Sequence, residues 1–517
     1  MKWFLPVISA ILLGLSFEKP YLWWIALFGL TPFLIFLEKI QSSDSDVKTA
    51  RKRRDALLGG WLFGFVFFAL IFRWVLYSFP GDWAGLHNSL TSVSLFGISW
   101  LMISIVVGFS FALFGFLALR FGTRSIFVIP SIWALSEYLR AWLFSLFSWG
   151  PGGSLGPHWT FGNLGYALID TPAILWSRVF GLYGASFIAV FINVLIFRLV
   201  IKRNIRAVPF LISVIILFFL PKIIFVDKQE EKLLNVALVH TEIKLGFLGE
   251  KKLILLLEEA KKSGEISEKP DIVVFPEGAR LFASDNAEKT LLERIFPDKE
   301  KDGLIITSDI ISTKQGLKEQ IIYRDQQGKL LSIQDKSFLI PAGEYLPLVL
   351  KGFITFFQDP SFIYRFDILR TRIKGKEAPK PVPFGDTRIG TILCSGITSP
   401  LLYRSLSDDG AEILVNSASQ IIFKNRSFFL SQVKTMARFQ AIANARPFVQ
   451  ASNGGQSFLI NSRGKIVAET ASFKNQILFV KVSPFKDKTF HTRFGNWPFA
   501  VGVLVLIIST FRSRKFQ

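Results

Sequence analysis

Three residues in the second half of the chain have side chains that could cooperate in covalent catalysis. Glu277, Lys336 and Cys394 occur in that order at nearly equal spacings, and Cys394 is the only cysteine. A cysteine nucleophile needs a base that takes its proton and a cation that favours the anion. Taken singly, each residue has a plain interpretation as a solvated carboxylate, a surface charge or a packed thiol. The combination favours a catalytic triad.

Each of the three residues stands beside the end of a predicted strand, where α/β folds place their sites. Glu277 follows an apolar run that ends in Pro276, and Cys394 ends another apolar run. Lys336 and Glu344 flank a short apolar stretch with a Pro/Gly turn. We predict strands at 234–239, 271–275, 303–308, 387–393 and 412–415, and helices at 251–262 and 427–444. This alternation predicts an α/β domain at 227–494, long enough to bury its own core.

The rest of the chain is too apolar for an ordinary soluble enzyme. Half of the residues are hydrophobic, Phe occurs 54 times, and the mean hydropathy is +0.41. A membrane-spanning helix needs a sustained apolar run. Six runs have that length, and two shorter runs, separated only by Glu18-Lys19-Pro20, are interpreted as a tight hairpin of helices. We therefore expect eight transmembrane helices, near 3–17, 21–38, 57–79, 91–119, 125–147, 179–198, 207–226 and 495–511.

The distribution of Lys and Arg predicts how these helices are oriented. The net charge is +21, and the basic residues gather at 39–56, 120–124, 198–206 and 512–515. The alternate loops 18–20, 80–90 and 148–177 carry almost none. The positive-inside rule then puts both termini in the cytoplasm and 227–494 outside it. We expect a seven-helix bundle at 1–226, an extracytoplasmic domain at 227–494 and a final helix with a basic tail at 495–517. The basic charge thus indicates a membrane, with no nucleic-acid partner.

The segments around the triad resemble a known superfamily. The residues Pro276-Glu277-Gly278, the run 335–347 and the run 390–394 are similar to the Glu-Lys-Cys motifs of carbon–nitrogen hydrolases (nitrilases). Fusion to membrane helices, with further matches at 73–75, 136–140, 445–447, 452–455 and 493–498, resembles the bacterial apolipoprotein N-acyltransferase family over essentially the whole chain. The resemblance implies an αββα sandwich beside a membrane bundle.

The resemblance also implies a reaction. An acyl group passes from a phospholipid to Cys394 as a thioester, and then to the α-amino group of an S-diacylglyceryl-cysteine at a lipoprotein N-terminus. Glu277 is the expected general base, Lys336 the oxyanion stabiliser and Glu344 the residue that positions Lys336 or the amine. The implied location is the bacterial inner membrane, with the catalytic domain on the periplasmic side. We expect a monomer, without cofactor or metal.

The sequence departs from the family pattern close to the site. Ser395 and Gly396 stand where an aromatic residue and a Glu are usual, Ser417 and Ser419 interrupt an Asn-Asp-Ala-Trp-Phe stretch, and Ala443 replaces a Glu. Residues that support a catalytic group hold its geometry. An alternative is therefore a paralogue that binds lipid or lipoprotein without turnover.

Two further sets of residues could contact lipid. Arg73, Glu137 and Arg140 are charged groups inside apolar spans, and intramembrane charge is frequently functional. Glu137 and Arg140 share a helix face, so a structural ion pair and a phospholipid phosphate site are both open. The segment 346–366 is unusually apolar, and its aromatic residues suggest either core packing or a lid that dips into the bilayer. Those aromatic residues include Phe353, Phe356 and Phe357.

Overall fold

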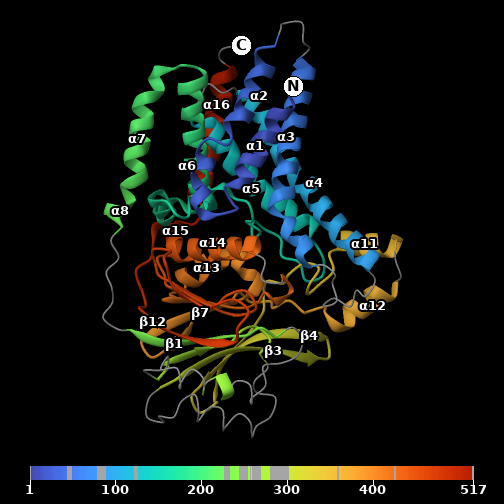
Figure 1. Cartoon of the computed structure of the whole chain (residues 1–517), viewed down its shortest axis with the longest axis vertical. Helices are drawn as coiled ribbons and strands as arrows, with labels where there is room; N and C mark the ends of the chain where they lie inside the picture. The colour runs from blue at the N-terminus through green and yellow to red at the C-terminus, as the bar shows by residue number, and fades with distance from the viewer. Residues whose placement is uncertain are drawn as a thin grey trace.

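The computed structural model divides into a helical bundle and a β-sandwich. It describes residues 2–43, 49–78, 89–121, 126–225, 233–243, 254–256, 258, 269–279, 302–357, 360–423 and 427–514. Figure 1 shows the bundle at one end and the two sheets at the other, with helices α13 and α14 between them. Both ends of the described chain lie on the far side of the bundle from the sandwich (Figure 1).

The bundle is built from apolar helices joined by short 3₁₀ turns. Its α-helices are α1 (Phe4–Leu15), α2 (Thr31–Gln41), α3 (Thr49–Ile71), α4 (Ser89–Phe121), α5 (Val128–Phe147), α6 (Ser177–Ile196), α7 (Val208–Phe219), α8 (Pro221–Ile224) and α16 (Trp497–Arg514). The 3₁₀ elements among them are η1 (Pro20–Leu27), η2 (Arg73–Ser78), η4 (Leu164–Leu168), η5 (Pro172–Trp176) and η7 (Ile205–Ala207), and η6 (Phe197–Ile201) is a short π-helix.

Four stretches among the described residues are long and apolar enough to cross a membrane. They are Tyr21–Gln41, Thr49–Ser78, Leu95–Phe121 and Pro172–Ile201. Three other apolar helices, Phe4–Leu15, Val208–Ile224 and Trp497–Ile508, are shorter. Helix α5 carries Glu137 and Arg140 in its interior. The membrane character of the chain is therefore supported, whereas the predicted count of eight spanning helices is not confirmed.

The sandwich consists of two six-stranded sheets. One sheet has the order β12-β1-β2-β3-β4-β5 and the other β11-β10-β9-β8-β7-β6. The strands are β1 (Leu234–His240), β2 (Ile272–Val274), β3 (Leu304–Thr313), β4 (Gly316–Asp325), β5 (Leu330–Asp335), β6 (Val382–Phe384), β7 (Thr387–Leu393), β8 (Ile413–Ser419), β9 (Phe448–Asn453), β10 (Phe458–Ile460), β11 (Ile466–Glu469) and β12 (Gln476–Val482). Their inward-facing Val, Leu and Ile side chains form one buried core, which holds the sheets face to face.

Helices cover the face of the second sheet that looks toward the bundle (Figure 1). They are α13 (Pro400–Asp408) and α14 (Ser427–Asn444), followed later by the short α15 (Phe490–Phe494). Two apolar helices, α11 (Leu348–Phe357) and α12 (Pro360–Leu369), extend sideways beside α4 (Figure 1). The short turns η8 (Cys394–Thr398) and η9 (Ile421–Phe423) follow strands β7 and β8. The five predicted strands and the helix at 427–444 are confirmed, while most of the predicted helix at 251–262 lies outside the described residues.

The sandwich is docked firmly on the bundle. An ion pair joins Arg438 of α14 to Asp170, with Nη1 and Oδ1 2.6 Å apart. Arg178 of α6 donates to the carbonyl of Ser462 at 2.9 Å. The ring of Trp74 packs against that of Phe429, with centroids 5.2 Å apart. Because these contacts join segments hundreds of residues apart, the two parts form one packed unit.

Candidate active site

The ends of three strands bring Glu277, Lys336 and Cys394 together. Glu277 follows β2, Lys336 directly follows β5, and Cys394 is the first residue of η8 after β7. The first two strands belong to one sheet and β7 to the other. The Nζ atom of Lys336 donates to Oε1 of Glu277 at 2.6 Å. The site therefore lies where both sheets end, as predicted from the strand-end positions.

Lys336 is the centre of a buried charge cluster. Besides Glu277, its ammonium donates to Glu344 at 2.5 Å and to Glu319 at 3.1 Å. Glu344 is held by the backbone N–H of Ile340, which donates to its second oxygen at 2.8 Å. An ammonium has three hydrogens, and in this arrangement three carboxylates use them. An oxyanion at Lys336 must therefore displace one of these carboxylates or share its donor.

Sequence reasoning missed Glu319. This residue lies on β4, is almost fully buried, and has Lys318 and Gln320 as its neighbours in the sequence. Nothing in that polar run distinguishes it from a solvated strand residue. The pairing of β4 with β5 could have pointed to Glu319. It places Gln320, the residue after Glu319, opposite Asp335, the residue before Lys336. Register of that kind is visible only after the strands have been paired.

Electrostatics within the cluster follow from burial and proximity. Burial alone would lower the pKa of Lys336, but the charges of Glu277, Glu319 and Glu344 outweigh it and raise that pKa well above its usual range. Burial raises the pKa of Glu344 to about 7, against the opposing pull of Lys336. Burial also raises the pKa of Glu319. Lys336 therefore stays charged, and Glu344 and Glu319 hold a proton more readily than exposed carboxyl groups do.

The backbone of Ser419, at the end of β8, links Glu277 to Cys394. Its N–H donates to Oε2 of Glu277 at 3.0 Å. Its carbonyl oxygen lies 3.7 Å from Sγ of Cys394, within range of a weak thiol hydrogen bond. Since the backbone of one residue contacts both side chains, the base and the nucleophile are held beside each other. Cys394 itself has a left-handed backbone, with φ of 39°, at the sharp turn from β7 into η8.

The thiol of Cys394 is neutral in this arrangement. Burial raises its pKa well above the usual range, the charge of Glu277 adds to that effect, and Lys336 opposes it. A thiol of this kind does not ionise in advance, so its proton must leave as the sulfur attacks. The neighbouring carboxylate is the group able to accept that proton.

The serines that depart from the family pattern have structural partners here. Ser417 donates to the carbonyl of Phe275 at 2.8 Å and so ties β8 to the segment before Glu277. Ser395 donates to the carbonyl of Phe338 at 3.0 Å. Ser419 acts through its backbone. Gly396 has little room for a side chain, because a Cβ there would lie 2.1 Å from Cγ2 of Ile392. The site is packed around the residues that are present.

An apolar cavity of about 180 Å³ leads to Cys394. Its walls come from the bundle on one side and from the sandwich with α11 and α12 on the other. The lining includes Trp74, Phe96, Phe144, Leu346, Ile354 and Phe366. Hydrophobic walls of this kind suit a hydrocarbon chain and keep water from the sulfur.

A loop of the bundle holds the turn that carries Cys394. Thr160 contributes its backbone N–H at 3.3 Å and its hydroxyl at 2.8 Å to the carbonyl of Thr398, the last residue of η8. The Nδ1 atom of His158 and the hydroxyl of Ser399 are 2.8 Å apart. Thr160 and Thr398 are buried. The membrane part of the chain thus fixes the position of the nucleophile turn.

The charged residues predicted inside the spans contact other side chains of the protein. Arg73 forms an ion pair with Glu18 and lies over the ring of Phe428, 3.7 Å from its centroid. Arg140 is fully buried and donates to the side chain of Asn163. Neither arginine lines the cavity at Cys394. A phosphate-binding role for either one stays a prediction.

Glu137, one turn before Arg140, is also buried. It accepts from the indole of Trp133 at 2.9 Å and from the backbone N–H of Leu164 at 2.7 Å. Its partners therefore include the loop that leads to η4. This arrangement suits a structural role, and a lipid contact stays a prediction.

The three predicted aromatic residues of the apolar segment lie on α11. Phe356 is 80% exposed and Phe353 is partly buried, while the side chain of Phe357 lies outside the described part. Leu350 and Ile354 of the same helix line the cavity. One face of α11 therefore packs over the cavity, and Phe356 points away from it.

The carboxylate cluster has the spacing of a metal site. Ligand oxygens of Glu277, Glu319 and Glu344 lie within 4.8 Å of one another. The ammonium of Lys336 bonds to all three and so takes the position of a cation. The residues present thus fit an internal ammonium rather than a metal.

Comparisons with known proteins show which families the chain is similar to. One family model, described as "Apolipoprotein N-acyltransferase N-terminal domain", matches residues 9–195, and another, "Carbon-nitrogen hydrolase", matches 250–485. The apolipoprotein N-acyltransferase of Pasteurella multocida is 24% identical and covers 98% of this chain and 95% of its own length. That of Haemophilus influenzae is 25% identical and covers 80% of this chain and 83% of its own.

Solved structures show similarity over about half of the chain. The carbon-nitrogen hydrolase from Helicobacter pylori G27 covers 52% of this chain and 94% of its own, with 17% identity and a TM-score of 0.35. Nit3 of Saccharomyces cerevisiae, a nitrilase-superfamily member, covers 52% and 97%, with 16% identity and a TM-score of 0.35.

Proposed function

We propose that this chain, which belongs to the apolipoprotein N-acyltransferase family, transfers a fatty acyl chain from a phospholipid to the N-terminal amino group of diacylglyceryl lipoproteins. Both family models and the near-full-length relatives support N-acylation. One observation carries the mechanism. Cys394, beside Glu277 and Lys336, lies at an apolar cavity that bundle and sandwich build together. A hydrocarbon chain and a cysteine nucleophile can meet there.

The first half-reaction loads Cys394. Glu277 takes the thiol proton while the sulfur attacks the ester carbonyl of the phospholipid. Lys336 stabilises the tetrahedral oxyanion, because a buried cation acts strongly where water is excluded. The intermediate collapses, the C–O bond breaks, and Glu277 returns the proton to the leaving hydroxyl of the lysophospholipid. The product is a thioester on Cys394.

The second half-reaction discharges the thioester. The lipoprotein's α-amine loses a proton to Glu277 and attacks the thioester carbonyl, again next to Lys336. The C–S bond breaks, the sulfur recovers the proton, and an amide remains on the acceptor. While the lysophospholipid leaves and the lipoprotein binds, the thioester escapes hydrolysis only if water is excluded from the site. The apolar lining of the cavity supports that requirement.

The placement in the membrane follows from the same proposal. Both substrates carry acyl chains, so the site has to open at the surface of a bilayer. We expect eight spanning helices, a monomer, and the sandwich on the periplasmic side of the bacterial inner membrane. Docking of the sandwich onto one end of the bundle, away from both chain ends, supports this orientation (Figure 1).

The test is acyl loading. Full-length protein in detergent is incubated with a phospholipid whose acyl chain carries an alkyne tag, and protein-bound label is measured. We expect label on the wild type that neutral hydroxylamine releases. Cys394→Ala should carry none, and Glu277→Gln should load at least about a hundredfold more slowly, the usual loss for a missing general base.

The controls separate chemistry from folding. Glu258→Gln replaces a carboxylate that lies outside the charge cluster, and it should load as the wild type does. An unlabelled wild type that is well folded by size-exclusion chromatography would contradict the proposal. So would label that resists hydroxylamine, because an amide or an oxygen ester behaves in that way and a thioester does not.

A further inference from the structure

The bundle contains a second and larger cavity that the acyl-transfer site does not use. Its volume is about 400 Å³, and it lies between α5, α6, α7 and α16. These helices, apart from α5, stand on the other side of the bundle from α4, α11 and α12, which border the Cys394 cavity (Figure 1). No residue in the described part of the chain lines both cavities. Its ligand is therefore held apart from the reacting sulfur.

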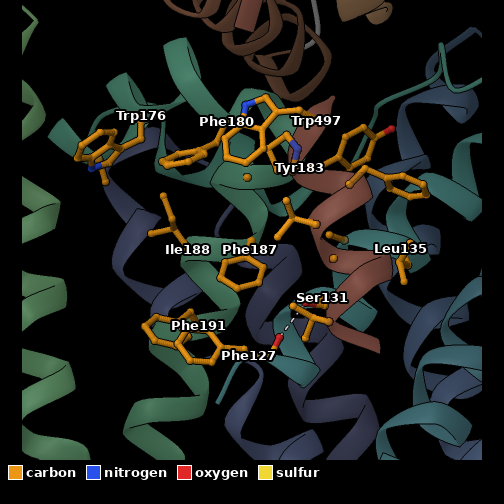
Figure 2. A pocket seen from close by; sticks show the side chains of 18 of the residues that line it. Phe127, Ser131, Leu135, Trp176, Phe180, Tyr183, Phe187, Ile188, Phe191 and Trp497 are labelled. Carbon is orange, nitrogen blue, oxygen red and sulfur yellow. Dashed lines mark hydrogen bonds between the residues drawn. The ribbon is translucent and has the colours of Figure 1, made fainter. Parts of the chain in front are cut away.

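The lining of this cavity is almost entirely apolar, with the hydroxyls of Ser131 and Tyr183 as exceptions. Figure 2 shows aromatic and aliphatic side chains along its length, with Trp176, Phe180 and Trp497 at one end and Phe191 and Phe127 at the other. The indole of Trp176 donates to the carbonyl of Leu217 at 2.8 Å, and that of Trp497 to Val179 at 2.9 Å. Both indole donors are thus engaged by backbone. Hydrocarbon is the chemistry that this lining solvates best.

The length of the cavity identifies the hydrocarbon. Phe180 and Phe191 bracket it along α6, and at 1.5 Å per residue they are about 16 Å apart. The hydrocarbon core of a bilayer is about 30 Å thick, so the cavity spans one leaflet. A partner's transmembrane helix would need a groove along the full thickness. A single lipid acyl chain is as long as one leaflet is thick. Trp176 and Trp497, at the end of the cavity nearer the sandwich, lie where tryptophans usually mark the lipid head groups.

We propose that this cavity retains an acyl chain of a bilayer phospholipid that is not turned over. The retained chain fills the space between α6, α7 and α16, in the leaflet that faces the sandwich. Helix α7 supports this, because its residues that face away from the bundle, including Ile212 and Ile216, are exposed and only Val214 and Phe218 are buried. A chain in the cavity packs behind α7 and completes its contact with the bundle.

The site also adjoins the contacts that hold the sandwich. The rings of Phe180 and Trp497 are 5.6 Å apart at its mouth. Beside them Gly181 has a positive φ, and a Cβ there would lie 2.7 Å from the ring of His491 in α15. His491 accepts from Arg404 of α13, the helix after the Cys394 turn. The retained chain therefore supports the junction between the bundle and the sandwich.

The experiment is photo-crosslinking of full-length protein in vesicles of phosphatidylcholine and phosphatidylethanolamine. A small fraction of the phosphatidylcholine carries a diazirine in the middle of one acyl chain. The protein is Cys394→Ala, so that no acyl-enzyme can form and the result does not depend on the proposed reaction. We expect adducts on α6 between Phe180 and Phe191 and on α16 between Trp497 and Val505.

A matched pair of variants tests occupancy. Gly502→Phe fills the cavity, because a Cβ at this position has ordinary contact, 3.7 Å from Cβ of Ser131. Leu504→Phe adds the same ring on the exposed face of α16. Adducts on α6 should fall roughly tenfold in the first and stay unchanged in the second. Ile188→Trp fills the cavity from α6 and replaces Gly502→Phe if that variant does not fold.

Two outcomes overturn the proposal. Equal labelling of α6 and of the exposed face of α7, unaffected by the filling variants, would mean ordinary surrounding lipid. Lack of α6 adducts would mean that no lipid chain enters the cavity, and a dimer on size-exclusion chromatography would then indicate that a second copy covers this face.

Discussion

At the scale of single residues, Lys336 is the cation that contacts three largely buried carboxyl groups. Its ammonium bonds to Glu277, Glu319 and Glu344, and it is itself buried. Taking charges out of water is costly unless they are paired. The same lysine therefore has a structural role and a catalytic one. Removing it should affect folding before any effect on turnover can be measured.

The first prediction concerns Lys336→Met, which keeps the length of the side chain and removes its charge. Leaving buried carboxylates unpaired should lower the free energy of unfolding by about 3–5 kcal/mol at neutral pH. The loss should be smaller at acid pH, where the carboxyls take up protons. Thermal unfolding followed by tryptophan fluorescence measures both. The control is Lys318→Met, whose half-exposed ion pair with Asp335 is worth less than about 1 kcal/mol. Equal effects of the two variants would contradict the argument.

The second prediction is a pH dependence that Glu344 causes. Burial raises the pKa of Glu344 from about 4.5 to about 7. In that interval the unfolded chain has already released the proton that the folded chain keeps, so the stability that Glu344 contributes falls as the pH rises. Wild-type stability should therefore drop by up to about 3 kcal/mol between about pH 4.5 and pH 7, relative to Glu344→Gln. Melting temperatures measured across this range test it, and parallel curves for the two proteins would contradict it.

The sequence predicts the triad because residue type and position at a strand end are both visible in it. Glu277, Lys336 and Cys394 combine a base, a cation and a nucleophile in a recognisable order. Glu319 is not predictable in this way, because its burial depends on how β4 pairs with β5. Ser419 is missed for another reason. It contributes its backbone N–H and its carbonyl oxygen, and the sequence does not show where such backbone groups are used.

At the scale of elements, the sequence predicts a strand or a helix where one pattern of apolar and polar residues continues through the whole segment. The strand 387–393 and the helix 427–444 have the predicted bounds. The segment 21–38 is apolar throughout, yet it begins as the 3₁₀ turn η1 and becomes α-helical at Thr31. An apolar composition predicts burial in a membrane, but it does not predict whether the segment is an α-helix or a 3₁₀ helix. That difference depends on packing against the neighbouring helices.

The third prediction concerns the hairpin of α11 and α12. One face of α11 lines the Cys394 cavity, while Phe356 and, on α12, Tyr364 are 80% and 70% exposed. Exposed aromatic side chains beside the bundle suit the surface of a bilayer. A fluorophore on a cysteine at position 356, in Cys394→Ala protein, should be quenched by brominated lipids in vesicles. The same label at Leu331 of β5, also exposed, should keep its intensity. An unquenched label at 356 would argue against a lid that enters the membrane.

At the scale of the whole molecule, the contacts between bundle and sandwich decide whether the site exists. Thr160 holds the turn after Cys394, and Trp74 and Phe429 share one aromatic contact. Residues in these pairs are hundreds of positions apart, and in the sequence none of them differs from an ordinary packed side chain. Sequence patterns report local periodicity, so they predict both parts of the chain without predicting how the parts meet.

The last prediction concerns orientation. Lys and Arg gather at 39–56, 120–124, 198–206 and 512–515, and the positive-inside rule assigns such segments to the cytoplasm. Both chain ends lie at the end of the bundle opposite the sandwich (Figure 1), as an even number of spans requires. Single cysteines in Cys394→Ala protein can test this with a membrane-impermeant maleimide on bacterial spheroplasts.

Val467→Cys lies on the exposed edge of the sandwich in β11, and Ser42→Cys lies just after α2, within the first basic segment. Intact spheroplasts should label the cysteine at 467 and leave the one at 42 unlabelled, while lysed spheroplasts should label both. The reverse pattern would put the sandwich in the cytoplasm. Labelling of both sites in intact spheroplasts would put both outside the cytoplasm, which requires an even number of crossings between them instead of the five predicted here. Because lipid acceptors displayed outside the cytoplasm can meet Cys394 only in the predicted orientation, this experiment also decides on which side of the membrane the acyl transfer takes place.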